Sequence, residues 1–198
     1  SGTTGRPKGI LRPLPHAHPA EALPVMDFIV NHLFHMREGM IYLSPAPIYH
    51  SAPNGFMNTV LSEGGTVVMM RRFDAEKTLA AIAEHKAEVL VAVPTMLHRM
   101  VALGADVIGK YDLSSLKIVV LAGSALSPTL SEAIQDTFGD VLYNLYGSTE
   151  VAIATVAQPK ELRLAPGTVG RAPVTSRLAL FDDKGNRISG TNMRGRLF

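Results

Sequence analysis

The sequence predicts an α/β fold, in which a parallel sheet is flanked by helices on both faces and a β-rich extension follows at the C-terminal end. The first observation is that short, continuously apolar runs alternate with helical patterns from Gly64 onward. Strands that are apolar at every position are typical of a parallel sheet with both faces covered. The second is that this alternation ends after Val151, and short strand patterns occupy Thr168–Phe198. We therefore expect an α/β subdomain over residues 1–165 and the start of a β-rich subdomain over residues 166–198.

Four buried strands carry the alternation, and each is a run rich in β-branched and apolar residues. They are expected at Thr66–Met70, Val89–Val93, Leu116–Leu121 and Val141–Leu145. Upstream of them the signals are weaker, and helices are expected over about residues 20–36 and 54–63. In the C-terminal extension, the polar run Asp182–Asn186 is typical of a turn.

Helices are expected between these strands because each connecting segment carries a start or a stop signal. Asp74 is a good N-cap for a helix that runs to about Lys86. A second helix is expected over Thr95–Leu103. The third begins at Ser127-Pro128, an N-cap followed by proline at the first helical position, and ends at Gly139.

The composition indicates a globular chain without a surface for nucleic acid. Of the 198 residues 46% are hydrophobic, so the chain can bury a sizeable core. The net charge is only +2, and no cluster of Lys or Arg is interleaved with aromatic residues. The chain has no cysteine, which excludes disulfides and thiolate metal sites. No apolar run approaches the ~20 residues of a membrane-spanning helix. We expect a soluble, cytoplasmic protein, and the sequence does not indicate its oligomeric state.

The first nine residues, Ser1-Gly2-Thr3-Thr4-Gly5-Arg6-Pro7-Lys8-Gly9, are typical of a loop that binds phosphate. Glycines among hydroxyl residues let backbone N–H and side-chain O–H groups converge on one anion, because no Cβ stands in the way. Lys8 adds a compact positive charge. The spacing differs from that of the P-loop of NTPases. Phosphate contacts are expected from Ser1, Gly2, Thr3, Thr4, Gly5 and Lys8.

Two further motifs follow neighbouring expected strands, Ala122–Pro128 after the third strand and Tyr146–Glu150 directly after the fourth. Because the carboxyl ends of parallel strands meet at one edge of a sheet, both motifs are expected there, beside one another. The second motif offers an aromatic ring, two hydroxyl groups and a carboxylate within five residues. A plain strand-to-helix turn does not need these groups, whereas a site for a nucleotide does.

Together the three motifs resemble those of the adenylate-forming superfamily, which includes acyl-CoA synthetases, firefly luciferase and the adenylation domains of peptide synthetases. Residues 1–9 resemble the family's phosphate loop. Tyr146–Glu150 matches its Tyr-Gly-x-Thr-Glu, and Ala122–Pro128 is similar to its Gly-Gly-Ala-Pro-Leu-Ser. The resemblance covers essentially the whole chain and is strongest to an acyl-CoA synthetase. It implies a central fragment of the large N-terminal domain, since the family's ribose-binding aspartate, hinge and C-terminal lysine domain have no counterpart here.

The resemblance also assigns roles to single residues. It implies that Tyr146 packs on adenine, that Thr149 contacts the α-phosphate and that Glu150 binds magnesium. Lys8, Thr149 and Glu150 would be the catalytic residues. The other residues implied to bind the nucleotide are Gly123, Ser124, Ala125, Asn144, Gly147 and Ser148. Ser124 and Ala125 replace the family's usual Ala and Pro, which changes side chains but conserves the backbone.

Among seven histidines, His50 has the most informative surroundings. It lies in Pro45–Pro53, which resembles the family's Pro-Leu-Phe-His segment. The resemblance implies that His50 lies beside the carboxylate substrate. His16 and His18 are spaced as metal ligands can be, but no carboxylate companion is evident, so no metal site is expected there.

The function implied by the resemblance is acyl-CoA synthesis in fatty acid metabolism, with ATP and Mg²⁺ as cofactors and coenzyme A as co-substrate. A small carboxylic acid would first form an acyl-adenylate, and the fragment alone is expected to be inactive. Two alternatives stay open. An amino-acid adenylation domain of a peptide synthetase usually has an aspartate near the position of His50, and no acidic residue occurs from Ser44 to Thr59. A non-catalytic nucleotide-binding module is disfavoured by the presence of both Lys8 and Glu150.

Overall fold

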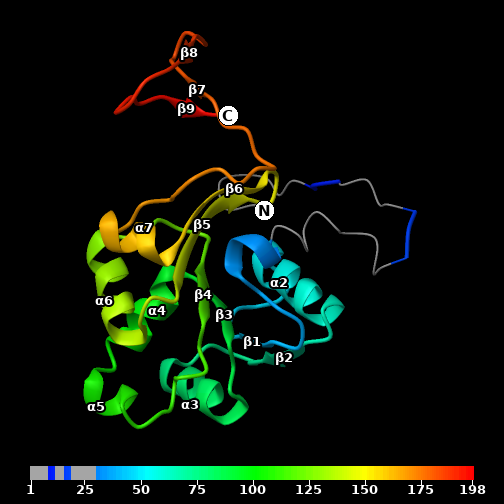
Figure 1. Cartoon of the computed structure of the whole chain (residues 1–198), viewed down its shortest axis with the longest axis vertical. Helices are drawn as coiled ribbons and strands as arrows, with labels where there is room; N and C mark the ends of the chain where they lie inside the picture. Colours follow the sequence, from blue (N-terminus) through cyan, green and yellow to red (C-terminus); the bar gives the residue numbers. More distant parts are fainter. Residues whose placement is uncertain (1–8, 12–15, 19–29) are drawn as a thin grey trace.

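A computed structural model describes residues 9–11, 16–18 and 30–198 (Figure 1). The predicted phosphate loop over residues 1–8 therefore lies outside the described residues. So does most of the helix expected over residues 20–36, of which residues 30–34 are helical. Within the described part, the α/β core contains a six-stranded sheet with the order β2-β1-β3-β4-β5-β6. Its strands are β1 (Ile41–Ser44), β2 (Thr66–Met69), β3 (Val89–Ala92), β4 (Ile118–Leu121), β5 (Leu142–Ser148) and β6 (Ala152–Ala157).

The first five strands run parallel, and β6 pairs antiparallel with β5. All four strands expected from the sequence are present, within two residues of their expected bounds at most ends. The exception is β5, which continues through Ser148 instead of ending at Leu145, because β6 returns alongside it as a hairpin. The mostly parallel α/β architecture confirms the predicted fold class.

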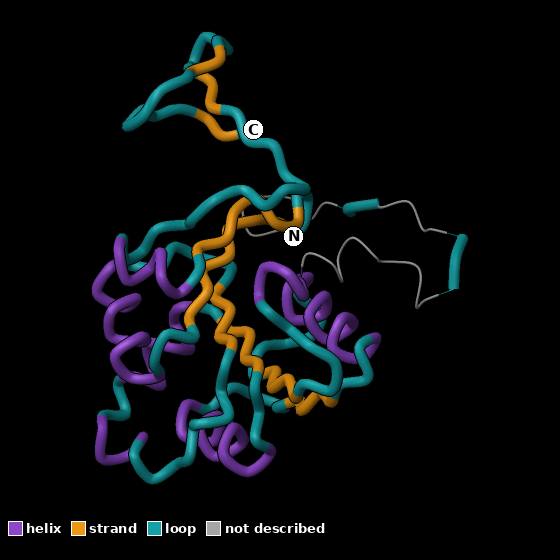
Figure 2. The backbone as a smooth tube through the Cα atoms, in the orientation of Figure 1, coloured by secondary structure: helices purple, strands orange, loops and turns teal. Residues whose placement is uncertain are grey.

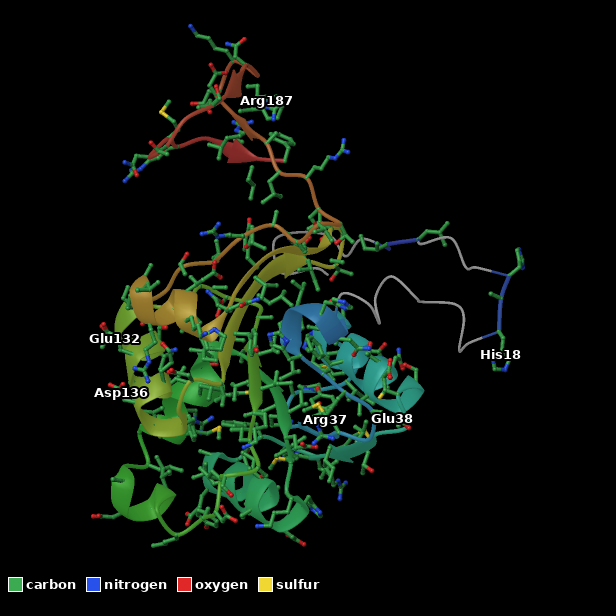
Figure 3. All side chains as sticks on the ribbon, viewed as in Figure 1. His18, Arg37, Glu38, Glu132, Asp136 and Arg187 are labelled. Atoms are coloured by element: carbon green, nitrogen blue, oxygen red, sulfur yellow. The ribbon has the colours of Figure 1, made fainter. Side chains whose placement is uncertain are left out.

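Strand β1 was not expected, although it lies inside the sheet between β2 and β3. It has only four residues, and Pro45 and Pro47 follow at once. Its start is fixed by Glu88, whose backbone N–H donates to the oxygen of Ile41 at 2.9 Å. The carboxylate of Glu88 also forms an ion pair with Arg37, which is labelled in Figure 3. These contacts join residues far apart in the sequence, so no local sequence pattern indicates β1.

Helices cover both faces of the sheet (Figure 1). Their bounds are α2 (Ser51–Ser62), α3 (Ala75–His85), α4 (Pro94–Val101), α5 (Ala105–Ile108), α6 (Pro128–Phe138) and α7 (Pro159–Leu164). The expected caps are present: Asp74 accepts from the Lys77 N–H at 2.9 Å, and Ser127 accepts from the Leu130 N–H at 3.2 Å. Helix α2 begins three residues before its expected start at Asn54, because Pro53 is tolerated in a first turn. The short helices α5 and α7 were not expected.

Alternate residues of the strands feed two separate cores, one on each face of the sheet. Leu90 and Leu121 belong to the core that α3, α4 and α6 cover. Val89 and Val91 belong to the core on the opposite face, which includes Phe34 and Phe56 of the helices there. Apolar residues at every strand position are therefore required, as a sheet covered on both faces demands.

A second, antiparallel sheet of three short strands stands apart from the α/β core in Figure 2. It comprises β7 (Leu180–Phe181), β8 (Arg187–Ile188) and β9 (Arg196–Leu197), with β7 in the middle. The expected turn at Asp182–Asn186 joins β7 to β8, and the Asp182 carboxylate accepts from the Asn186 N–H at 2.8 Å. This bond holds the pKa of Asp182 below its usual value. The exact boundary of a subdomain at residue 165 stays a prediction.

Candidate active site

The carboxyl ends of the parallel strands bring the segments of the candidate site to one edge of the sheet. The segment with His50 follows β1, and Gly123 follows β4. In the register of β4 and β5, Leu121 lies opposite Asn144. Gly123 and Tyr146 are each two residues further along, so the turn after β4 lies beside the start of the tyrosine motif.

The tyrosine motif forms the end of β5 and the tip of a hairpin. Tyr146 pairs with Thr155 and Ser148 pairs with Ala152, with an irregular register between them. The motif was expected to follow the strand, and this was wrong for its first three residues, because the antiparallel partner extends the strand. Thr149 and Glu150 lie in the turn.

The hairpin closes so tightly that only glycine fits at position 147. A Cβ on Gly147 would lie 1.9 Å from the backbone oxygen of Ala152. Ala152 itself has a left-handed conformation with φ of 58°. A non-glycine residue in this region costs roughly 1–2 kcal/mol. The backbone that carries Thr149 and Glu150 is thus held in a strained, tightly defined turn.

Asn144, expected to line the purine, is buried in β5 with 3% exposure. Its amide nitrogen donates to the backbone oxygen of Thr168 at 2.8 Å. Two residues on, Gly170 has φ of 71° and lies against the backbone of Val156, where any Cβ would come within 2.0 Å of the Val156 oxygen. Asn144 therefore helps to fix the segment after α7 across the sheet. Its contact with a purine stays a prediction.

The turn after β4 is open to solvent. Gly123 has φ of 92°, which turns the chain out of the strand, and Ser124 and Ala125 are exposed. Exposure at a strand's carboxyl end leaves backbone groups accessible to a ligand. Their contacts with a purine stay a prediction.

His50 is the N-cap of α2, and its side chain makes no capping hydrogen bond. Its ring packs against the ring of Tyr49, with centroids 4.4 Å apart. The next residue, Ser51, has its hydroxyl oxygen 3.3 Å from that of Thr149. The histidine segment and the tyrosine motif therefore meet. The sequence did not single out Ser51, because its partner lies 98 positions away.

Two cavities lie near this edge. One of about 370 Å³ is bounded by Tyr146, Gly147 and Ser148 of the motif and by Leu197 and Phe198 of the small sheet, among other residues. Tyr146 as a whole residue is 46% exposed, so it is accessible to a ligand.

A second cavity, of about 600 Å³, follows β2 and is lined by Met70, Arg71, Arg72 and Lys77. Its cationic lining favours an anionic ligand. These residues could not be singled out from the sequence, because their separate charges form no motif.

The described side chains can be searched for groups that would bind the implied magnesium ion. Over residues 9–11, 16–18 and 30–198, no three His, Asp or Glu side chains are grouped closely enough to hold a metal ion. Magnesium is commonly bound by one or two carboxylates together with substrate phosphates. Glu150, exposed at the hairpin tip, fits such a shared site, in which the nucleotide supplies the other ligands.

Every helix in the described ranges is too short or too polar to cross a lipid bilayer.

Several characterised proteins are similar to this chain over most of its length. Indoleacetate–CoA ligase of Aromatoleum aromaticum is 30% identical over 95% of the chain and 36% of its own length. Medium/long-chain-fatty-acid–CoA ligase FadD8 of Mycobacterium tuberculosis is 30% identical over 94% of the chain and 32% of its own length. The chain thus spans about a third of the length of these relatives.

Solved structures show the same fold. The amide bond synthetase McbA of Marinactinospora thermotolerans is 26% identical, with a TM-score of 0.78 over 87% of this chain and 35% of that one. O-succinylbenzoate coenzyme A synthetase of Bacillus subtilis, in complex with AMP, has a TM-score of 0.78 at 21% identity, over 100% of this chain and 38% of that one. The family model described as AMP-binding enzyme matches residues 1–198. The chain therefore belongs to the family of AMP-binding enzymes.

Proposed function

We propose that this chain is part of an ATP-dependent acid–thiol ligase of the acyl-CoA synthetase type. The observation that carries the proposal is the contact between Ser51 and Thr149, which brings the segment of His50 beside the tyrosine motif. A carboxylate held near His50 would then face a nucleotide held by Tyr146–Glu150. The CoA ligases among the relatives, together with the family match, support this type of activity.

The reaction proceeds in two steps. A carboxylate oxygen of the acid attacks the α-phosphorus of ATP, the bond from that phosphorus to the bridging oxygen breaks, and pyrophosphate leaves. The sulfur of coenzyme A then attacks the acyl carbon, loses its proton, and displaces AMP. Neither step needs a covalent bond to the protein, so the residues of the site act by binding, orientation and charge.

Each residue of the motif has a role in this scheme. Tyr146 stacks on adenine, and Thr149 donates its hydroxyl proton to the α-phosphate as negative charge builds up there. Glu150 would hold a magnesium ion, which would supply positive charge beside the phosphates. Lys8 and the loop over residues 1–5 also bind the phosphates in this proposal. Preorganised groups of this kind typically contribute about a hundredfold or more each to the rate.

Coenzyme A carries several phosphates, and the cavity lined by Arg71, Arg72 and Lys77 has the charge to receive them. It lies after β2, at the same sheet edge as the tyrosine motif. The order of strands places β2 four spacings from β5, or roughly 19 Å at ~4.8 Å a strand. A long, flexible ligand is needed to span this distance. We place the nucleotide end of coenzyme A in this cavity.

The substrate in this proposal is a simple acyl or aryl carboxylate, with no nucleic-acid partner. A place in fatty acid metabolism, in the cytoplasm, belongs to the same proposal, as does the inactivity of the 198-residue fragment by itself. An amine is the second candidate acceptor, since one structural relative is an amide bond synthetase at 26% identity. The acceptor is decided by the second half-reaction.

The complete protein that contains this chain provides the test. Exchange of labelled pyrophosphate into ATP, with Mg²⁺ and a panel of fatty and aryl acids, measures the first step. Thioester formation measures the second, and replacing coenzyme A by simple amines tests the alternative. Arg71→Ala and Arg72→Ala should raise the KM for coenzyme A and leave exchange unchanged. Absence of exchange with every acid would refute the proposed function.

A further inference from the structure

The hydroxyl groups of Ser51 and Thr149 form a hydrogen bond at the centre of the candidate site, with 3.3 Å between the oxygens. Ser51 is the first residue of α2, and Thr149 lies in the turn between β5 and β6. The bond joins the segment proposed to hold the acid to the segment proposed to hold the phosphate. Nothing in the proposed reaction has so far given Ser51 a role.

The two ends of this bond are held by different parts of the fold. Helix α2 buries Phe56, whose ring packs edge-on against Phe34 with centroids 5.3 Å apart. Phe34 in turn packs against Tyr143 of β5, again at 5.3 Å. This aromatic stack fixes α2 relative to the strand that leads into the hairpin. Thr149 lies in the tight turn of that hairpin, so the bond to Ser51 links its side chain to a packed helix.

The effect of the bond from Ser51 on Thr149 follows from the chemistry of hydroxyl groups. A hydroxyl has one proton to donate and two lone pairs that accept. When Ser51 donates to Thr149, the Thr149 oxygen is the acceptor in that bond, so the Thr149 O–H group acts as a donor elsewhere. The rotation of the Thr149 hydroxyl is then restricted before a nucleotide binds, which is the preorganisation that stabilises developing charge.

We propose that Ser51 is a positioning residue, which donates to Thr149 and directs the Thr149 proton toward the α-phosphate of the nucleotide. This inference rests on the proposed function and deepens it. It requires that Ser51 acts through Thr149 alone. The effect should therefore appear in the rate of adenylation, where charge develops on the phosphate, more than in the binding of ATP.

The first test is substitution of Ser51 in the complete protein. Ser51→Ala should lower kcat of the adenylation step about tenfold, the scale of one hydrogen bond, and change the KM for ATP less than about twofold. Ser51→Thr keeps a hydroxyl in the same place and should restore most of the rate. Ser62→Ala, which removes a hydroxyl bonded within the last turn of the same helix, is the control and should leave kcat unchanged. Melting temperatures of Ser51→Ala and Ser51→Thr should match that of the wild type.

The second test is a double-mutant cycle with Thr149→Ala. If Ser51 acts through Thr149, the double variant is no slower than Thr149→Ala alone, because coupled residues do not add. Losses that multiply independently, or an unchanged kcat in Ser51→Ala with an active wild type, would overturn this inference and leave the proposed function standing. A wild type that forms no acyl-adenylate from any acid would remove the proposed function and this inference together.

Discussion

The side-chain nitrogen of Asn144 lies 2.8 Å from the backbone oxygen of Thr168, so a buried residue of β5 holds the segment that follows α7. The same segment is fixed again three residues later, where Val156 and Arg171 exchange backbone hydrogen bonds of 2.9 and 3.1 Å. The segment from Thr168 to Arg171 is therefore held in place by residues of β5 and β6.

Asn144→Ala should destabilise the complete protein by about 1–3 kcal/mol, because the Thr168 oxygen loses its buried donor. Asn58→Ala is the matched control, since Asn58 is exposed on α2 and bonds only across one helical turn to Asn54 at 3.1 Å. It should change stability by less than about 0.5 kcal/mol. Urea unfolding of the three proteins compares them. Equal losses in both variants would show that the Asn144 bond has no special weight.

Gly147→Ala should disrupt the hairpin, because the added Cβ cannot lie 1.9 Å from the Ala152 oxygen. We expect a clear drop in melting temperature and loss of pyrophosphate exchange. Gly55 offers the opposite case on α2, with nothing within 4 Å of an added Cβ. Gly55→Ala should stabilise the protein by roughly 0.5–1 kcal/mol. If both variants melt alike, the close approach at Gly147 is not what selects glycine there.

The buried phenol of Tyr42 should lower the free energy of unfolding at alkaline pH. Burial raises its pKa to about 12, although a bond to Ser44 opposes the shift. Below pH 10 the phenol is neutral in both states, so its contribution is complete. Between about pH 10 and 12 the unfolded chain ionises and the folded one does not, so stability falls as pH rises.

The measurement for Tyr42 is the free energy of unfolding from pH 9 to 12, a window taken from that raised value. Tyr42→Phe should show a shallower decline than the wild type. Tyr49→Phe, at a side chain that is 81% exposed, should follow the wild type. Tyr143, whose pKa burial also raises, is present in every protein compared and cancels. Parallel curves for Tyr42→Phe and the wild type would contradict the prediction.

Glu150→Gln and Lys8→Ala should each slow adenylation about a hundredfold or more, the scale of one lost electrostatic partner in the transition state. Far-UV circular dichroism and melting temperature should change little for Glu150→Gln, since that side chain is exposed. Single-turnover formation of acyl-adenylate is the readout. Wild-type kcat/KM in either variant would show that its assigned role is wrong.

The complete protein should prefer octanoate to every proteinogenic amino acid. No acidic residue lies between Ser44 and Thr59 to pair with an ammonium group near His50. A buried charge without a partner costs several kcal/mol, which corresponds to roughly a thousandfold in selectivity. AMP formation in a mixture of octanoate and amino acids measures the preference. Preference for any amino acid would favour the peptide-synthetase alternative instead.

The parts of the fold that sequence reasoning predicted are those set by local signals. Asp74 and Ser127 cap helices with their own side chains, so they indicate where those helices begin. The strands can be recognised from their continuous apolar runs, because both faces of the sheet are covered. Strand β1 and the hairpin partner β6 escaped prediction, since each depends on partners along the sheet. The motif of Tyr146 was correctly placed at the sheet edge, but its extended backbone depends on β6.

The same distinction holds for the site. Tyr146, Thr149 and Glu150 stand out as a compact motif, whereas Ser51 becomes visible only through a partner 98 positions away. Arg71 and Arg72 likewise gain meaning from a cavity that the fold creates. Chemistry that is local in the sequence could be predicted, and chemistry that the topology assembles could not.

The order of the sheet has a consequence for how the protein forms. Strands β1 and β2 pair first along the chain, and β3, β4 and β5 then add outward in sequence on the other side of β1. Parallel pairings of this kind close long loops, which makes them slow steps of folding. The hairpin with Thr149 follows the helix start with Ser51 in the chain, with β2, β3 and β4 between them. The Ser51–Thr149 hydrogen bond, which joins two segments 98 positions apart, can therefore form only once β5 and β6 have paired.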